Sequence, residues 1–293
     1  MTRTIPQLLM IVALGLIGGT LGGLLGLGGS VFIIPALVLL LGANQHLYQA
    51  AALIANVFVA AAATLRHRGR GTIRADVVPM MATASAIAAL CGVAVSNRLQ
   101  PNALQALFGV FLCYASVSEV ISLASKRAEP AEPAVGSLSR WLPICIGAVG
   151  GFASGLLGIG GGAIMVPMLR KLGKLPIRQA VASAAAAMIV ACTIGAIAKN
   201  ATIADRTAAD GTPLTLQSSL LLALLLSPSA MLGGSLGASL VYRLPIPAIR
   251  TVLSMLLAFS GYQMINKALA AAPTQRPAAT ETAAPPKADA ATP

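Results

Sequence analysis

The sequence has 293 residues, of which 57% are hydrophobic and only 10% are charged, with a mean hydropathy of +0.83. A soluble domain of this length would carry charge on about a quarter of its residues. The formal net charge is +12, but the lysines and arginines stand in short segments between apolar runs, as the positive-inside rule requires. Composition therefore predicts an all-α polytopic membrane protein, surrounded by lipid bilayer and with no nucleic-acid partner. Because the apolar runs are continuous rather than alternating, they argue against a membrane β-barrel.

The apolar runs form two groups of four, and most of them approach the roughly 20 residues that cross a bilayer core. We expect a first transmembrane repeat over residues 1–124, a polar linker over 125–140 and a second repeat over 141–270. The Ala/Pro-rich tail at 271–293 has the composition of a disordered segment. The expected runs are 5–42, 47–65, 77–96, 102–123, 141–169, 176–198, 217–240 and 246–269.

The first run is too long for the core of a signal peptide. We therefore expect it to remain in the protein as a membrane segment. For a bacterial source, the expected location is the inner membrane.

Two Gly-rich stretches open the two halves and echo each other. Residues 22–35 read GGLLGLGGSVFIIP, and residues 154–167 read SGLLGIGGGAIMVP. Two shorter echoes follow in the same order: Gln-Ala at 49 and 179, and Arg-Leu at 98 and 243. Three matches in one order indicate an internal duplication.

Charge in the matching loops predicts that the duplication is inverted. The loop after the first run has no Lys or Arg in the first half, whereas residues 170–178 carry four in the second half. The loop after the second run has the reverse bias: four arginines at 66–74, but only Lys199 and Arg206 beside two aspartates in the second half. Equivalent loops then face opposite sides of the membrane, which is typical of transporters with two inverted repeats.

An inverted duplication needs an odd number of crossings in each half. It predicts about 8–10 transmembrane segments, with a Gly-broken hairpin of two short helices opening each half. A single tilted span is the alternative for each opening run. The hairpin topology puts both termini outside and four basic segments on the cytoplasmic side, at 66–74, 126–140, 170–178 and 243–250.

The glycine clusters predict helix breaks that build a substrate site. Glycine weakens a helix by about 1 kcal/mol relative to alanine, and unpaired backbone cannot face lipid, so each break must lie inside the protein. The free N–H groups that begin the following helix favour an anion. The candidate substrate-binding residues are Gly26, Gly28, Gly29, Ser30, Gly158, Gly160, Gly161 and Gly162, together with two polar residues inside the runs, Asn56 and Ser183.

Each of these residues has a structural alternative. Asn56 is equally suited to bonding another helix, and the Ser183 hydroxyl can bond its own helix. Glycines at GxxxG spacing, at 19 and 23 and at 233 and 237, are more typical of close helix packing. A homodimer through such small-residue faces is a further expectation. We expect the two histidines, His46 and His67, to lie in loops and to be solvated.

The repeated Gly-rich stretches, the RHRGRGTI loop (66–73) and the MLGGSLGASLVYRLP stretch (231–245) resemble the TauE/SafE family of sulfite exporters. The resemblance covers most of residues 10–268. It implies a small-anion permease that exports sulfite or a related organosulfonate. Family members often carry a Thr-Ser pair near the start of the second run of each half. Here Ala51 and Ala52 stand at the first pair, and only Ser183 remains of the second, which puts the family's substrate in doubt.

These features favour a secondary transporter that holds a small anion at the broken-helix backbone and works by alternating access. A permease for another small organic anion, such as a carboxylate, is the alternative. A membrane enzyme would need a nucleophile–base pair, and none is found, so no catalytic residue, metal ligand set or cofactor is predicted. A non-transporting scaffold would have no use for irregular buried backbone.

Overall fold

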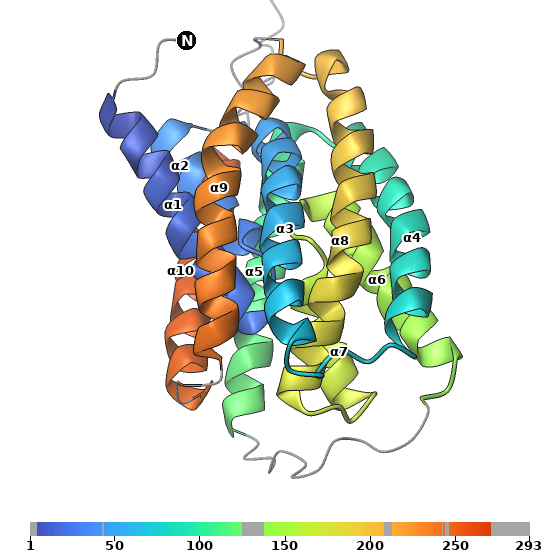
Figure 1. Ribbon diagram of the computed structural model, residues 1–293. Helices are drawn as coiled ribbons and strands as arrows, with labels where there is room; N and C mark the ends of the chain where they lie inside the picture. Colours follow the sequence, from blue (N-terminus) through green and yellow to red (C-terminus); the bar gives the residue numbers. More distant parts are fainter. Residues whose placement is uncertain are drawn as a thin grey trace, which may run out of the picture.

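The computed structural model describes residues 5–42, 44–124, 138–207, 213–241, 243 and 246–270. These residues form α-helices joined by short connections (Figure 1), which confirms the all-α class. The linker and tail predicted at 125–140 and 271–293 lie almost wholly outside the described residues. The helices are α1 (Ile5–Leu25), α2 (Ser30–Leu41), α3 (Gln45–Arg68), α4 (Val78–Arg98), α5 (Pro101–Ala124), α6 (Trp141–Leu157), α7 (Gly162–Lys171), α8 (Ile177–Ala201), the short 3-10 helix η1 (Ile203–Asp205), α9 (Leu216–Leu240) and α10 (Ile246–Ala270).

Both opening runs are broken at their glycine clusters, as the sequence predicted. Residues 26–29 separate α1 from α2, and residues 158–161 separate α6 from α7. The second helix of each pair turns back along the first, so that Gly18 packs on Ile33 and Gly150 packs on Met165. A single tilted span is therefore excluded for either run.

One detail of the hairpin prediction is wrong, because α1 is not a short helix. It has 21 residues and, by length and composition, can cross a bilayer by itself. Its glycines do not interrupt it because they lie against neighbouring helices, where the absence of a side chain is used for packing.

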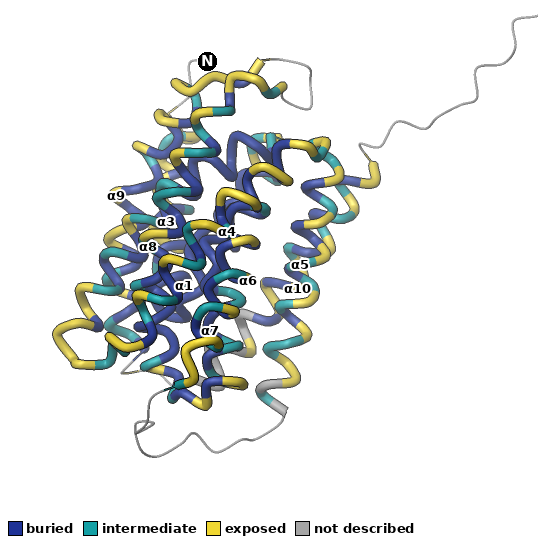
Figure 2. Tube along the Cα trace, turned by 90° about the vertical axis from the view of Figure 1, so that its right-hand side faces the viewer, coloured by how far each residue is buried: buried dark blue, intermediate teal, exposed yellow. Residues whose placement is uncertain are grey.

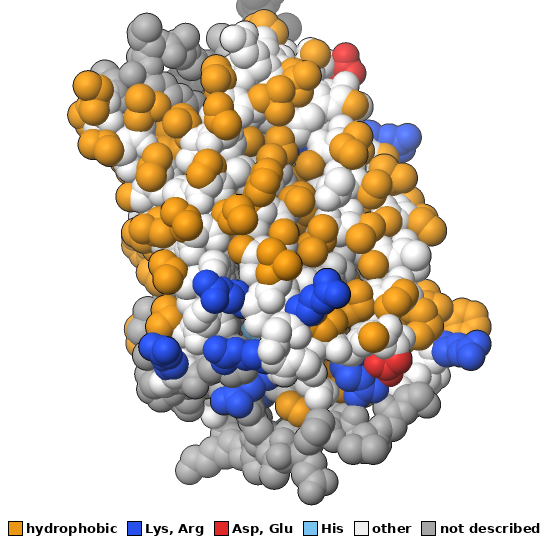
Figure 3. Space-filling model, viewed as in Figure 1, with side chains coloured by type: hydrophobic (Ala, Val, Ile, Leu, Met, Phe, Trp, Pro, Cys, Tyr) orange, Lys and Arg blue, Asp and Glu red, His pale blue; other side chains and the backbone are white. Residues whose placement is uncertain are grey.

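Six of the described helices are long and apolar enough to span a membrane: α1, α3, α4, α5 (over 101–121), α8 and α9. The helices α2 and α6 are apolar but shorter. Apolar side chains cover most of the face in Figure 3, and lysines and arginines gather at its lower end. We call this the basic end; segments 66–74 and 170–178 contribute to it. The total number of crossings stays a prediction.

The helices pair across the two halves of the chain. α1 packs on α9, α4 on α6 and α5 on α10, while α3 and α8 lie side by side in the buried centre (Figures 1 and 2). The pairing is reciprocal: the contacts of α1 and α3 with α9 correspond to those of α6 and α8 with α4. In Figure 1 the first half runs from the top to the bottom, and the second half runs back to the top. These features support the inverted repeat, which itself stays a prediction.

Glycines hold the α1–α9 and α4–α6 pairs together at short range. A Cβ on Gly23 would lie 2.7 Å from the Cα of Gly234, and a Cβ on Gly151 would clash with the backbone of Ser85. The GxxxG glycines at 19, 23, 233 and 237 all face the partner helix, which confirms their packing role. Because these faces are used within the chain, the predicted homodimer would need another surface.

We predict that Gly23→Ala lowers the stability of the detergent-purified protein by about 1–3 kcal/mol, because the added methyl group overpacks the α1–α9 contact. Thermal unfolding measures this loss. Gly195→Ala is the matched control, since a Cβ on this mid-helix glycine would meet Leu53 at an ordinary 3.6 Å. Equal melting temperatures for the two variants would contradict the packing role.

Candidate functional site

The two helix breaks meet in the interior. A Cβ on Gly28 would lie 2.8 Å from the carbonyl oxygen of Ile159, and a Cβ on Gly162 would collide with the carbonyl oxygen of Gly26. The N-terminal ends of α2 and α7 therefore lie close together, although 132 residues separate their first residues. All eight sequence-predicted backbone positions of the two clusters are buried and share this region.

Asn56 joins the two breaks. From the middle of α3, its Nδ2 donates to Ser30 Oγ at 2.7 Å, and its Oδ1 accepts from the Ser30 backbone N–H at 3.2 Å. The same Nδ2 lies 3.5 Å from the carbonyl oxygen of Gly158. Asn56 is fully buried, and the amide suits this position because it can donate and accept at once.

Positive φ angles explain why glycine is needed at the centre of each break. Gly28 has φ of +85° and Gly160 has φ of +77°, a region that costs an L-residue roughly 1–2 kcal/mol. Space is also short, since a Cβ on Gly160 would lie 2.7 Å from Met188 Cε and 3.0 Å from Asn56 Nδ2. The backbone at both breaks is thus tightly packed, and only glycine fits at Gly28 and Gly160 without strain.

The structure adds three residues that sequence reasoning missed: Gln49 of α3, and Met188 and Cys192 of α8. Gln49 packs on Gly158 and donates from Nε2 to the carbonyl oxygen of Leu156 at 3.3 Å. Met188 contacts glycines of both breaks, and Cys192 Sγ lies 3.9 Å from the carbonyl oxygen of Gly160. The repeated Gln-Ala pair was the available signal for Gln49; apolar residues such as Met188 carried none.

Ser183 has a hydrogen-bond partner outside the Asn56–Ser30 pair. Its Oγ accepts from the backbone N–H of Arg74 at 3.1 Å, which ties α8 to the segment between α3 and α4. The Arg74 side chain pairs with Asp76 at 2.7 Å. This hydrogen bond lowers the pKa of the Asp76 carboxyl and raises that of the arginine. A substrate contact for Ser183 stays a prediction.

A cavity of about 410 Å³ reaches the breaks from one side. Leu27 lies at the first break and Ala163 at the second, whereas Lys171 lies at the far end of α7, in the basic end. Ser118 and Glu119 of α5 add polar groups to the lining. The lining of this cavity thus extends from the first break to the C-terminal end of α7.

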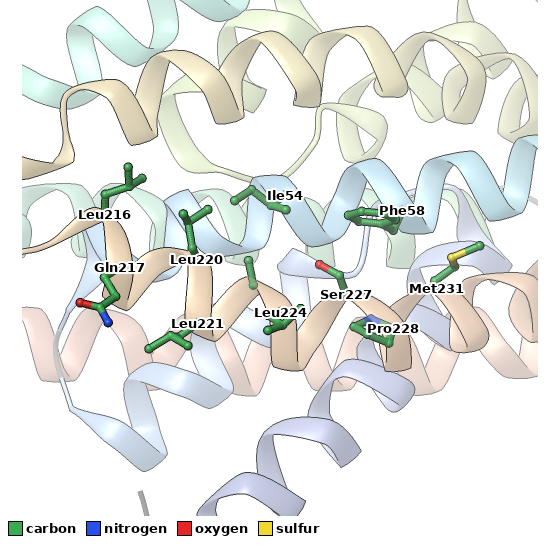
Figure 4. Close-up of a pocket in the computed structure, with 11 residues that line it drawn as sticks. Ile54, Phe58, Leu216, Gln217, Leu220, Leu221, Leu224, Ser227, Pro228 and Met231 are labelled. Atoms are coloured by element: carbon green, nitrogen blue, oxygen red, sulfur yellow. The ribbon is translucent and has the colours of Figure 1, made fainter. Parts of the chain in front are cut away.

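A larger cavity of about 760 Å³ lies elsewhere, between α3 and α9. Figure 4 shows Ile54 and Phe58 of α3 facing a row of α9 side chains that includes Leu220 and Leu224. Ser227 and Gln217 are its polar members. An anion gains nothing from such an apolar lining, so we do not assign the substrate to it.

Both histidines were predicted in solvated loops, and this is wrong. His46 lies in the first turn of α3 and His67 in its last turn, and both are buried. Lys199, also assigned to a loop, is buried in α8 and is bonded to His46. Helix ends that look polar in sequence are covered here by neighbouring helices.

The sequence model described as "Sulfite exporter TauE/SafE" matches residues 11–264. The chain belongs to the TauE/SafE family. This confirms the resemblance seen in the Gly-rich stretches. In this family member, the two repeated stretches contain the two helix breaks.

Relatives of this TauE/SafE protein carry transporter names. The Probable membrane transporter protein YunE of Bacillus subtilis is 27% identical over 281 residues, 89% of this chain and 98% of YunE. Probable membrane transporter protein MamO of Paramagnetospirillum magneticum is 23% identical, over 90% of this chain but only 45% of MamO. Probable membrane transporter protein MJ0441 of Methanocaldococcus jannaschii is 27% identical, over 59% of this chain and 65% of MJ0441. No solved structure matches significantly. The chain is thus a multi-pass membrane transporter.

We predict that Asn56→Ala lowers stability by about 1–3 kcal/mol, because it leaves the buried Ser30 N–H without its acceptor. Thermal unfolding in detergent is the measurement. Thr193→Ala should be nearly neutral, since that hydroxyl bonds only Ile189 of its own helix. An Asn56→Ala protein as stable as the Thr193→Ala control would contradict the bridging role of Asn56.

Proposed function

We propose that this transporter carries a small anion, sulfite or a related organosulfonate, across the membrane by alternating access. The anion binds at the backbone of residues 26–30 and 158–162. One observation carries this proposal: the breaks place the N-terminal ends of α2 and α7 against each other. Each such end carries a partial positive charge and N–H groups that lack helical partners.

The arrangement favours an anion over a cation or an apolar substrate. Neither α2 nor α7 has a side-chain cap of its own, because glycine precedes each helix. Asn56 already satisfies the Ser30 N–H, and an anion would compete with Ser30 Oγ and the Gly158 carbonyl for the hydrogens of its Nδ2. Donors from backbone and amide bind an anion without full neutralisation, so we expect modest affinity and ready release.

Alternating access is supported by the way the site is enclosed. The breaks are buried, and the lining of the 410 Å³ cavity runs from them to Lys171 in the basic end. Basic segments at that end raise the local concentration of anions. Opening toward the other end would require α8 to separate from α4, which packs on α6 and α8 of the second half.

The Asn56→Asp variant tests the anion site. A carboxylate of the same shape can accept from the Ser30 N–H, and its charge suits a helix N-terminus. The same charge repels an anionic substrate. We predict at least a tenfold loss of sulfite efflux from preloaded proteoliposomes, with stability no lower than that of Asn56→Ala.

Gln217→Glu is the control, because it makes the same chemical change at an exposed position of α9 and should leave efflux unchanged. Wild-type efflux by Asn56→Asp would refute the site. If wild-type protein moves acetate but neither sulfite nor methanesulfonate, the substrate is a carboxylate instead. Gly28→Ala is a poor test, because its backbone strain would reduce flux without any role in binding.

A further inference from the structure

A lysine is buried at the end of the molecule opposite the basic end. Lys199, near the C-terminal end of α8, is 1% exposed. Its Nζ donates to Ser96 Oγ at 2.7 Å, to His46 Nδ1 at 3.0 Å and to Asn97 Oδ1 at 3.1 Å. His46 in turn points Nε2 at the carbonyl oxygen of Leu99, at 3.3 Å.

These acceptors satisfy the three donors of an ammonium group but not its charge. A buried cation is costly unless an opposite charge lies beside it. The ion pair between Arg74 and Asp76 lies between α3 and α4 at the basic end, far from this lysine. Two charged residues are close in sequence to the residues that surround Lys199: Arg98 follows Asn97, and Asp205 is six residues after Lys199. Both are exposed.

A second cation faces the same asparagine. The Arg206 guanidinium donates to the backbone carbonyl of Asn97, while Lys199 takes the side-chain oxygen of Asn97. The Nε of Arg206 is buried and has no hydrogen-bond partner. Two cations and one unused buried donor therefore converge on Asn97, and no acidic partner for them is found in the part of the chain that the structure describes.

The cluster is connected to the helix breaks. Ser96, which accepts from Lys199, donates to Gln49 Oε1 at 3.3 Å. Gln49 is the residue that packs on Gly158 and bonds the last turn of α6. A change at Lys199 thus reaches the second break through two side-chain hydrogen bonds.

We propose that Lys199 and Arg206 form a second anion site, at which the transported anion enters or leaves the protein on the side opposite the basic end. This rests on the proposed function for the identity of the ligand, a small oxyanion such as sulfite. The anion supplies the missing negative charge, and charge-assisted hydrogen bonds from Lys199 replace those to neutral acceptors.

Asn97→Asp tests the site by building in the counter-charge. The new carboxylate would lie where Asn97 Oδ1 is now, 3.1 Å from Lys199 Nζ. We expect a higher melting temperature than wild type without added anion, and no further rise on adding sulfite. The wild-type protein should be stabilised by sulfite in proportion to binding. Lys199→Met should also lose the sulfite-dependent shift, and its half-saturating sulfite concentration for flux should rise about tenfold, equivalent to ~1.4 kcal/mol.

Arg98→Met is the matched control. It removes one positive charge from the same end, next to Asn97, without touching the cluster, and both readouts should stay at wild-type values. If Asn97→Asp is destabilised and keeps the sulfite-dependent shift, the lysine carries no uncompensated charge and the proposal fails. The proposal would also fail if Lys199→Met kept both the sulfite-dependent rise in melting temperature and the wild-type half-saturating sulfite concentration for flux.

The two readouts separate this proposal from the proposed function. A sulfite-dependent melting shift that Asn97→Asp abolishes, together with no flux by the wild-type protein, would establish the site and reject sulfite transport. Wild-type flux with no effect of Lys199→Met would support sulfite transport and reject the site. The absence of both the shift and the flux would reject both.

Discussion

The central constraint on this fold is that backbone N–H and C=O groups cannot be left unpaired in a membrane interior. A chain that breaks two helices must therefore enclose both breaks in protein. This protein brings the breaks together and surrounds them with α3 and α8. Asn56 bonds Ser30 at the first break and approaches Gly158 at the second. One amide side chain thus ties together backbone from the two halves of the sequence.

Close helix packing makes this enclosure feasible. Without a hydrophobic driving force between helices in lipid, association depends on close contact of small residues and on hydrogen bonds. The α1–α9 and α4–α6 contacts run through glycines whose backbones nearly touch the partner helix. Each of these pairs joins one half of the chain to the other. Glycine therefore has two separate functions. It allows close helix packing in α1, α6 and α9, and it allows a positive φ at Gly28 and Gly160.

The distribution of charge fits the transport of an anion that must also be released. The hydrogen bonds of Asn56 run to Ser30 and to the backbone of Gly158, and the proposed binding there relies on helix ends and amide donors. Full charges stand at the two ends instead, in the exposed basic end and in the buried Lys199 cluster. A site that binds through partial charges holds an anion loosely, and conduction through successive sites requires that each one release its ligand. Gln49 connects the far cluster to the second break.

The sequence by itself determined the class, the family and the location of the breaks. The length of an apolar run predicts membrane insertion, and a cluster of glycines predicts a broken helix. Both features can be predicted because they depend on residues that are close together in the sequence. The sequence also selected Asn56 as a candidate site residue, since a polar residue inside an apolar run is costly and therefore informative, and the structure shows it bonded to the candidate Ser30. Only the tertiary structure decided which residues meet. Gln49 and Met188 lie at the breaks because α3 and α8 cross there, and His46 and Lys199 are buried where they bond each other and residues at the C-terminal end of α4. Ser183 bonds the backbone of Arg74, a contact between residues more than a hundred positions apart, which no local pattern encodes.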